Sequence, residues 1–226
     1  MSVPTVFSSS YGPLRALRNV AIAFCLWLMA ANTGFAEKLT IVALGDSLTA
    51  GYGLAPDLGF VPVLQGWLKA NGYDVTVENA GVSGDTTAGG LARLDWALSP
   101  DADAMIVNLG GNDLLRGLAP AQAQANIDKI LATAEAKHLP VLLVGLKALN
   151  NYGPDYKAEF DAIYPALAAK YHTLYIDDYF GPIKSSQAEL TANVQADGLH
   201  PNAKGVVKIV AAMGPMVEKL LAEVKP

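Results

Sequence analysis

Short apolar runs alternate along this chain with longer segments in which apolar residues recur at helical spacing. Five runs are rich in β-branched residues and predict strands at 39–44 (LTIVAL), 74–79 (DVTVEN), 104–109 (AMIVNL), 140–145 (PVLLVG) and 173–177 (TLYID). The longer segments predict helices at 58–71, 86–98, 120–137, 156–171 and 202–224. Such alternation is typical of an α/β protein in which helices cover both faces of a parallel sheet.

Glycine-rich polar stretches follow three of the predicted strands. They are GDSLTAGYGL at 45–54, AGVSGDTTAGG at 80–90 and GGNDLLRG at 110–117, and a fourth polar stretch, DGLHPN at 197–202, precedes the last predicted helix. In open parallel sheets, sites form in the crevice beyond the carboxyl ends of the strands. We therefore expect these stretches to meet at one edge of the sheet.

The polar stretches contain the residue types that acyl transfer requires, namely a nucleophile, a base and a group that orients the base. Ser47 follows the first strand, and Asp197 stands three residues before His200, so that one turn can bring the carboxylate to one ring nitrogen. Ser47 could instead cap a helix. His200 could serve only at the start of the last helix, with Pro201 at its first helical position.

Two further residues could stabilise a developing oxyanion. Asn112 places an uncharged amide donor after a central strand, and Gly84 could offer a bare backbone N–H at the head of the next helix. Asn112 could equally form a turn, and Gly84 could belong to a loop before the helix cap.

Apolar and aromatic residues near these stretches suggest a pocket for an acyl or aryl group. Ordinary packing around the loops is an equally good explanation for them. The candidate substrate-binding residues are Tyr52, Leu54, Leu149 and Tyr152.

Two other classes of function compete with acyl transfer. Asp46, Asp113 and Asp197 could hold a hard cation in a metal-dependent phosphohydrolase, although that hypothesis leaves Ser47 and His200 without a role. A non-catalytic periplasmic binder could also use the same fold, but would have no need of a complete catalytic set.

The N-terminal segment has the pattern of a secretory signal peptide. Residues 1–36 contain two arginines and no acidic residue, and the apolar run at 20–31 is shorter than the ~20 residues of a membrane span. We expect cleavage near Ala36, a single mature domain at 37–226 and a periplasmic or secreted location, with an uncleaved anchor as the alternative. The only cysteine, Cys25, lies in this segment, so the mature domain has no cysteine nucleophile or disulfide.

The net charge of the chain indicates which classes of partner it can bind. The whole chain has a net charge of −5, and removal of the two arginines leaves 14 basic and 21 acidic residues, or −7. A surface that binds nucleic acid would normally be basic. We expect a small-molecule substrate, no nucleic acid, no membrane span in the mature form and a monomer.

The blocks GDSLTAGYGL, NAGVSGDT, GGND and DGLHPN stand in the order found in the SGNH (GDSL) hydrolase family, which the chain closely resembles over residues 38–224. Its periplasmic branch comprises arylesterases, lysophospholipases and acyl-CoA thioesterases of the thioesterase I type. The resemblance implies a flavodoxin-like three-layer α/β/α fold with strand order 2-1-3-4-5. The stretch 145–156 has KALN where the branch is richer in proline, which leaves acyl-chain preference open.

The resemblance also assigns roles to residues. It implies that Ser47 is the nucleophile, His200 the general base and Asp197 the group that orients His200. The N–H groups of Ser47 and Gly84 and the side chain of Asn112 would form the oxyanion hole. No metal or organic cofactor is expected.

Overall fold

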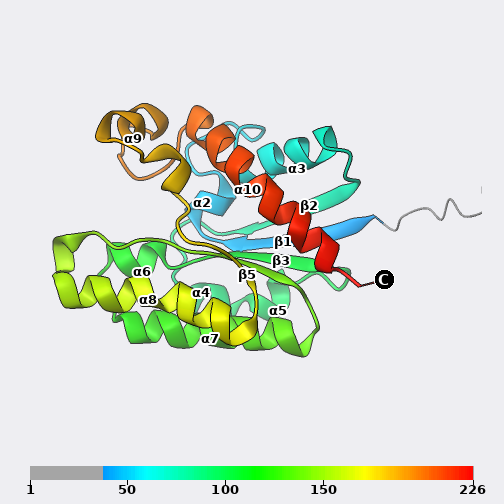
Figure 1. Ribbon diagram of the computed structural model, residues 1–226, viewed down its shortest axis with the longest axis horizontal. Coiled ribbons are helices and arrows are strands. Elements are labelled where there is room, and N and C mark those ends of the chain that lie inside the picture. The colour runs from blue at the N-terminus through cyan, green and yellow to red at the C-terminus, as the bar shows by residue number, and fades with distance from the viewer. Residues whose placement is uncertain (1–37, 226) are drawn as a thin grey trace, which may run out of the picture. The chain divides into compact units, whose positions relative to one another are not determined.

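A parallel sheet of five strands runs through the centre of the protein (Figure 1). The structure is a computed structural model that describes residues 38–225, so the expected signal peptide at 1–36 lies outside the described residues. The strands are β1 (Leu39–Gly45), β2 (Val75–Gly81), β3 (Ala104–Asn108), β4 (Val141–Val144) and β5 (Leu174–Ile176). All neighbours are parallel and the order is β2-β1-β3-β4-β5, which confirms the fold class and the strand order.

Helices cover both faces of the sheet (Figure 1). One face carries α2 (Ser47–Ala50), α3 (Phe60–Ala70), α9 (Gln187–Asn193) and α10 (Ala203–Glu223). The other carries α4 (Thr87–Ala92), α5 (Leu94–Ala97), α6 (Gly111–Leu115), α7 (Pro120–Ala136) and α8 (Pro154–Tyr171). Two 3-10 turns, η1 (Asn150–Tyr152) and η2 (Gly181–Ile183), follow β4 and β5.

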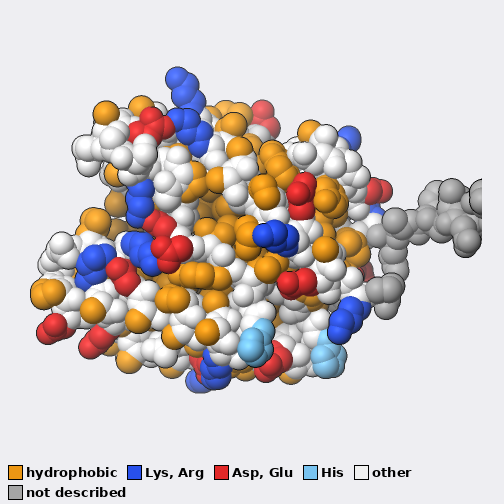
Figure 2. Space-filling view, viewed as in Figure 1, with side chains coloured by type: hydrophobic (Ala, Val, Ile, Leu, Met, Phe, Trp, Pro, Cys, Tyr) orange, Lys and Arg blue, Asp and Glu red, His pale blue; other side chains and the backbone are white. Residues whose placement is uncertain are grey.

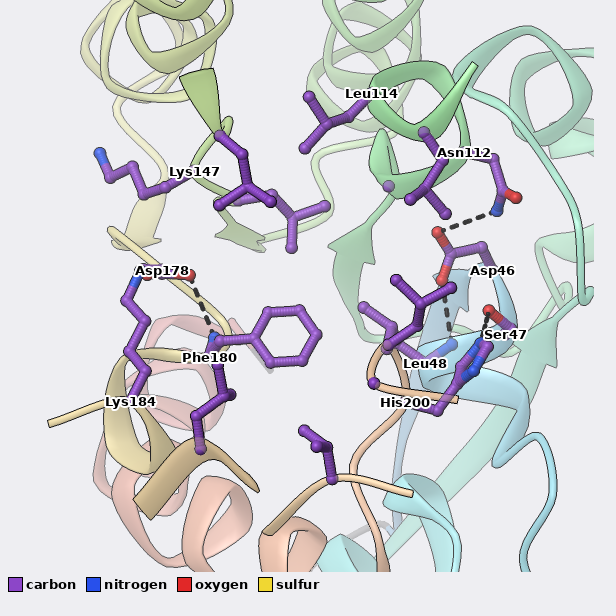
Figure 3. A pocket seen from close by; sticks show the side chains of 18 residues that line it. Asp46, Ser47, Leu48, Asn112, Leu114, Lys147, Asp178, Phe180, Lys184 and His200 are labelled. Atoms are coloured by element: carbon purple, nitrogen blue, oxygen red, sulfur yellow. Dashed lines mark hydrogen bonds and ion pairs between the residues drawn. The ribbon is translucent and has the colours of Figure 1, made fainter. Parts of the chain in front are cut away.

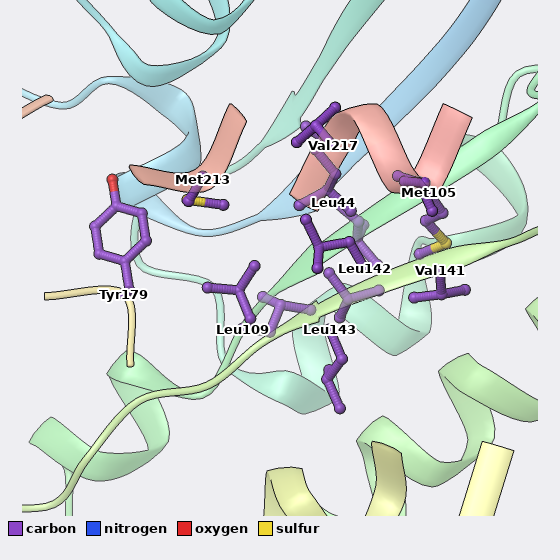
Figure 4. Close-up of a cluster of buried hydrophobic side chains, with 14 of the residues drawn as sticks. Leu44, Met105, Leu109, Val141, Leu142, Leu143, Tyr179, Met213 and Val217 are labelled. Atoms are coloured by element: carbon purple, nitrogen blue, oxygen red, sulfur yellow. The ribbon is translucent and has the colours of Figure 1, made fainter. Parts of the chain in front are cut away.

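The central strands are buried on both faces, as their near-continuous apolar sequence predicted. Every residue of β3 and β4 is buried. Figure 4 shows Leu44, Met105 and Leu142 packed together with Met213 and Val217 of α10. Each fully buried aliphatic side chain of this size contributes about 1.5–3 kcal/mol relative to an exposed one, so this core fixes the sheet from which the site is built.

The structure corrects one predicted helix and the expected start of another. The helix expected at 86–98 is interrupted at Arg93, after a segment that two glycines weaken as a helix. The last helix begins at Ala203, because Asn202 Oδ1 accepts from the N–H groups of Lys204 (3.0 Å) and Gly205 (3.1 Å) and so caps it. Pro201 precedes this cap and forms an isolated bridge with Val194.

Within residues 38–225, no helix has the length and apolarity that crossing a bilayer would require.

Candidate active site

Three side chains from the two ends of the described chain form a continuous hydrogen-bonded line. His200 Nε2 lies 2.8 Å from Ser47 Oγ, and His200 Nδ1 lies 2.6 Å from Asp197 Oδ2 (Figure 3 shows Ser47 and His200). The other oxygen of Asp197 accepts from the N–H groups of Leu199 (2.9 Å) and His200 (3.1 Å). This is the geometry of a serine nucleophile, a histidine base and a carboxylate that orients the base.

The end of β1 places Ser47 at the first turn of α2. Asp46 caps α2, because its Oδ1 accepts from Leu48 N–H at 3.0 Å. A Cβ atom at Gly45 would lie 2.0 Å from Thr49 Oγ1 and 2.9 Å from Asn108 O, so only glycine allows the chain to turn here. The turn holds Ser47 Oγ at the carboxyl end of the sheet, where it faces His200.

The two carboxyl groups beside the serine have opposite pKa shifts. Burial acts to raise the pKa of Asp197, but the Leu199 N–H and the ring and N–H of His200 outweigh it and lower the pKa to about 2. Asp197 is therefore a carboxylate at neutral pH and can hold the His200 ring through Nδ1. Burial raises the pKa of Asp46 to about 6, against the opposing effects of the Leu48 N–H, His200 and Asn112.

The candidate oxyanion donors lie on loops that the structure ties together. Asn112 Nδ2, in the first turn of α6, donates to Asp85 O at 3.0 Å and lies 3.4 Å from Asp46 Oδ2. Gly84 has φ of 88°, and its carbonyl accepts from Arg116 at 2.9 Å. Its N–H makes no hydrogen bond within residues 38–225.

A cavity of about 220 Å³ opens beside Ser47 and His200. Its lining is largely apolar and includes Leu48, Leu114, Leu146, Leu149, Phe180, Leu190, Val194 and Leu199. The space can hold an acyl group next to the serine, since small-molecule sites are typically apolar with a few placed polar groups.

Of the four residues expected to bind substrate, the structure places only Leu149 in the cavity lining. The ring of Tyr52 packs against His200, with centroids 4.7 Å apart. Leu54 packs against the core, and the Tyr152 hydroxyl donates to Leu115 O at 3.0 Å. These three side chains support the loops around the site, so the packing alternative describes them better.

Residues that the sequence did not single out also hold the site. Arg93 donates through Nε to Asp85 Oδ2 at 2.6 Å and through a terminal nitrogen to Gly45 O at 2.9 Å, which ties the loop after β2 to the end of β1. Its place inside a predicted helix gave no signal of this role. The cavity residues Asp178, Phe180 and Lys184 follow β5, and their position after a strand end was a signal that could have found them.

The three aspartates of the metal hypothesis are occupied by other partners. Asp113 is buried, and its oxygens accept from Thr87 N–H (2.8 Å) and Thr87 Oγ (2.7 Å). Asp46 caps α2, and Asp197 holds His200. Within residues 38–225 no three acidic, histidine or cysteine side chains come together as metal ligands.

Comparison with known proteins agrees with this geometry. Residues 43–207 match the model of the GDSL-like Lipase/Acylhydrolase family. The chain is 38% identical over 206 residues to "Esterase TesA" of Pseudomonas aeruginosa, covering 91% of this chain and 100% of that protein. It is 33% identical over 198 residues to the Escherichia coli protein named "Thioesterase 1/protease 1/lysophospholipase L1", covering 87% and 91%. A solved structure titled "Crystal Structure of TesA" has 38% identity and a TM-score of 0.73, over 80% of this chain and 99% of that one.

Proposed function

Because the chain belongs to the GDSL-like lipase/acylhydrolase family and is a serine esterase/thioesterase, we propose that Ser47 is its nucleophile, His200 its general base and Asp197 the group that orients the base. The observation that carries this assignment is the line of contacts from Ser47 Oγ through His200 to Asp197, at 2.8 Å and 2.6 Å. It gives each of the three side chains one role in a two-step acyl transfer.

Acylation begins when Ser47 Oγ attacks the carbonyl carbon of the ester or thioester. His200 Nε2 accepts the proton from Oγ, and Asp197 stabilises the charged ring through Nδ1–H. The carbonyl oxygen becomes an oxyanion, which accepts hydrogen bonds from the N–H groups of Ser47 and Gly84 and from Asn112 Nδ2. The 3.4 Å contact between Asn112 Nδ2 and Asp46 Oδ2 is weak, so the amide hydrogen that makes this contact is available for donation to the oxyanion.

Collapse of the tetrahedral intermediate completes acylation. The bond from the carbonyl carbon to the leaving oxygen or sulfur breaks, and His200 returns its proton to the alcohol or thiol. Water then attacks the acyl-serine, His200 takes a proton from the water, and Ser47 Oγ leaves with that proton as the carboxylic acid is released. Each half of the cycle uses the same base and the same oxyanion donors.

We propose acyl or aryl esters and thioesters as substrates, including the lysophospholipids and acyl thioesters suggested by the names of the relatives. The apolar lining of the cavity supports an acyl group in it. We also propose that cleavage near Ala36 releases residues 37–226 as a monomer that is periplasmic or secreted. That location argues against cytosolic acyl-CoA as the physiological substrate.

The test compares residues 37–226 with the Ser47→Ala variant on p-nitrophenyl esters, with and without a chelator of divalent cations. We expect hydrolysis by the wild-type protein that the chelator leaves unchanged and that the variant lacks. Loss of activity with chelator would favour the phosphohydrolase type of site, and absence of hydrolysis by the folded wild-type protein would favour the binder.

A further inference from the structure

The wall of the cavity opposite the serine is charged. Figure 3 shows Ser47 and His200 on one side of the cavity and Lys147, Asp178 and Lys184 on the other. The apolar side chains of the lining lie between these two sides, and the ring of Phe180 points into the space (Figure 3). An acyl chain bound to Ser47 therefore starts at the catalytic groups and runs over apolar surface toward an ionic one.

Asp178 and Lys184 form an ion pair at this far end. The Asp178 side chain is only 9% exposed, and its Oδ1 accepts from Phe180 N–H at 3.1 Å. Apart from the ion pair, Asp178 Oδ2 has no hydrogen-bond partner within residues 38–225. Among residues 38–225, the Lys184 ammonium is thus the only group that compensates this nearly buried carboxylate oxygen, and a partner of this kind is costly to displace.

The ammonium group of Lys184 is partly desolvated even without a bound substrate. Burial, together with the charges of Lys147 and Lys157, lowers the pKa of its ammonium. The Lys184 side chain nevertheless keeps 41% of its surface exposed, so part of this side chain remains in contact with solvent. Figure 2 shows basic and acidic side chains gathered between α9 and α8, as expected for a charged rim at that end. Lys147 forms a separate ion pair, with Asp177, in which Nζ lies 2.5 Å from Oδ1.

Lengthening the acyl chain of the ester therefore has two opposite effects on binding. Each methylene buried against leucine or phenylalanine improves binding by roughly fourfold. A chain that reaches the pair must instead cover a charged group and remove its water, which costs free energy. The cavity volume of about 220 Å³ is also below the range of roughly 300–1,000 Å³ found in sites for drug-sized ligands.

We propose that the Asp178–Lys184 ion pair ends the acyl cavity and restricts the enzyme to esters whose acyl chains stop short of it. This inference rests on the proposed function, since it takes Ser47 as the point from which the acyl chain extends. It narrows the proposed substrates to esters and thioesters with short and medium acyl chains, so that among lysophospholipids only those with such chains would fit. The two residues act on specificity and take no part in the chemistry.

The test measures kcat/KM on p-nitrophenyl esters from acetate to laurate for the wild type, for each single variant and for the Asp178→Asn/Lys184→Met double variant. Asparagine keeps the acceptor for Phe180 N–H while it removes the charge. The matched control is Asp128→Asn/Lys170→Met, which removes a similar ion pair, joined at 2.5 Å, from the surface of α7 and α8. Circular dichroism and thermal unfolding verify that each variant folds, and Lys184→Gln replaces Lys184→Met if the latter does not.

In the double variant we expect the laurate-to-butyrate ratio of kcat/KM to rise at least about tenfold, which corresponds to two additional buried methylenes at roughly fourfold each. The single variants leave one unpaired charge and should not raise this ratio, nor should the control. An unchanged length profile in the folded double variant would overturn the proposal. So would faster hydrolysis by the wild type of an ester with a terminal carboxylate than of the alkyl ester of equal length, because the pair would then recognise an anion.

Failure of this inference can be separated from failure of the proposed function. If Ser47→Ala still hydrolyses esters of every length, the assignment of the nucleophile is wrong whatever the length profile. If Ser47→Ala is inactive and the double variant has the wild-type profile, only the role of the ion pair is wrong.

Discussion

Ser47 Oγ and His200 Nε2 lie 2.8 Å apart, although 153 positions separate the two residues in the chain. The contact exists because β1 delivers Ser47 to the carboxyl edge of the sheet, and the segment before α10 returns His200 to the same edge. Asp197 Oδ2 then holds the far side of the ring at 2.6 Å. A fold that brings these atoms together allows the serine to lose its proton as it attacks.

Replacement of Asn112 by alanine should lower kcat by about 100-fold to 1000-fold, because one preorganised donor to the oxyanion is lost. Steady-state kinetics on a short p-nitrophenyl ester measure the effect. Asn71→Ala is the matched control, since the Asn71 amide only donates to Trp67 O at the end of α3. Turnover by Asn112→Ala within a few fold of the wild type would remove Asn112 from the oxyanion hole.

Replacement of Asp46 by asparagine should change how stability depends on pH. The pKa of Asp46 is about 6 in the folded protein, against an ordinary value of 3.8 for a free aspartate, so the folded state binds the proton more tightly between these pH values. Its contribution therefore makes the free energy of unfolding fall as pH rises from 4 to 6 and then level off. The variant should lack this fall, which amounts to about 3 kcal/mol.

Urea unfolding at a series of pH values tests this difference. The exposed Asp57, changed to asparagine, is the control, and its curve should follow that of the wild type. If Asp46→Asn keeps the full decline between pH 4 and pH 6, the decline belongs to other groups.

Replacement of Tyr52 distinguishes between two roles for this residue, which are to position the base His200 and to bind the substrate. Its ring centroid is 4.7 Å from that of His200, so Tyr52→Ala should lower kcat by about 2-fold to 10-fold through loss of this packing. Tyr52→Phe keeps the ring and should retain the wild-type rate. An increase in KM with kcat unchanged in Tyr52→Ala would instead support contact with the substrate.

Asp113 should prove structural. Its carboxylate accepts both from the N–H and from the hydroxyl of Thr87, and so fastens α4 to α6. Asp113→Ala leaves these donors buried without an acceptor, which should lower the free energy of unfolding by about 1–3 kcal/mol for each. Asp113→Asn keeps one carbonyl acceptor and should lose less in urea unfolding. Equal stability of Asp113→Ala and the wild type would contradict the role.

The sheet could be predicted because its strands are local patterns. Each of the five apolar runs became a strand within two residues of its predicted limits, since continuous apolarity and burial on both faces go together. The boundary at the last helix was harder, because both Pro201 and Asn202 can begin a helix. The two hydrogen bonds that Asn202 Oδ1 accepts settle it.

The candidate site could likewise be predicted from the sequence only in part. Ser47, Asn112 and His200 stand in motifs after strand ends or before a helix. Polar residues at such places in the sequence indicate a functional site. The links made by Arg93 to Asp85 and Gly45 depend on how α4 packs against the sheet, which no local pattern encodes. The charged end of the cavity likewise arises only where the segment after β5 folds back beside the loop after β4.

Covalent labelling of the nucleophile tests the central assignment most directly. The protein is incubated with a p-nitrophenyl alkylphosphonate, and intact mass and peptide mapping locate the label. We expect one label per chain, on Ser47, with loss of activity in step with labelling, much slower labelling in His200→Ala and none in Ser47→Ala. Inactivation with the label on another residue, or undiminished labelling of Ser47→Ala, would contradict the assignment of Ser47.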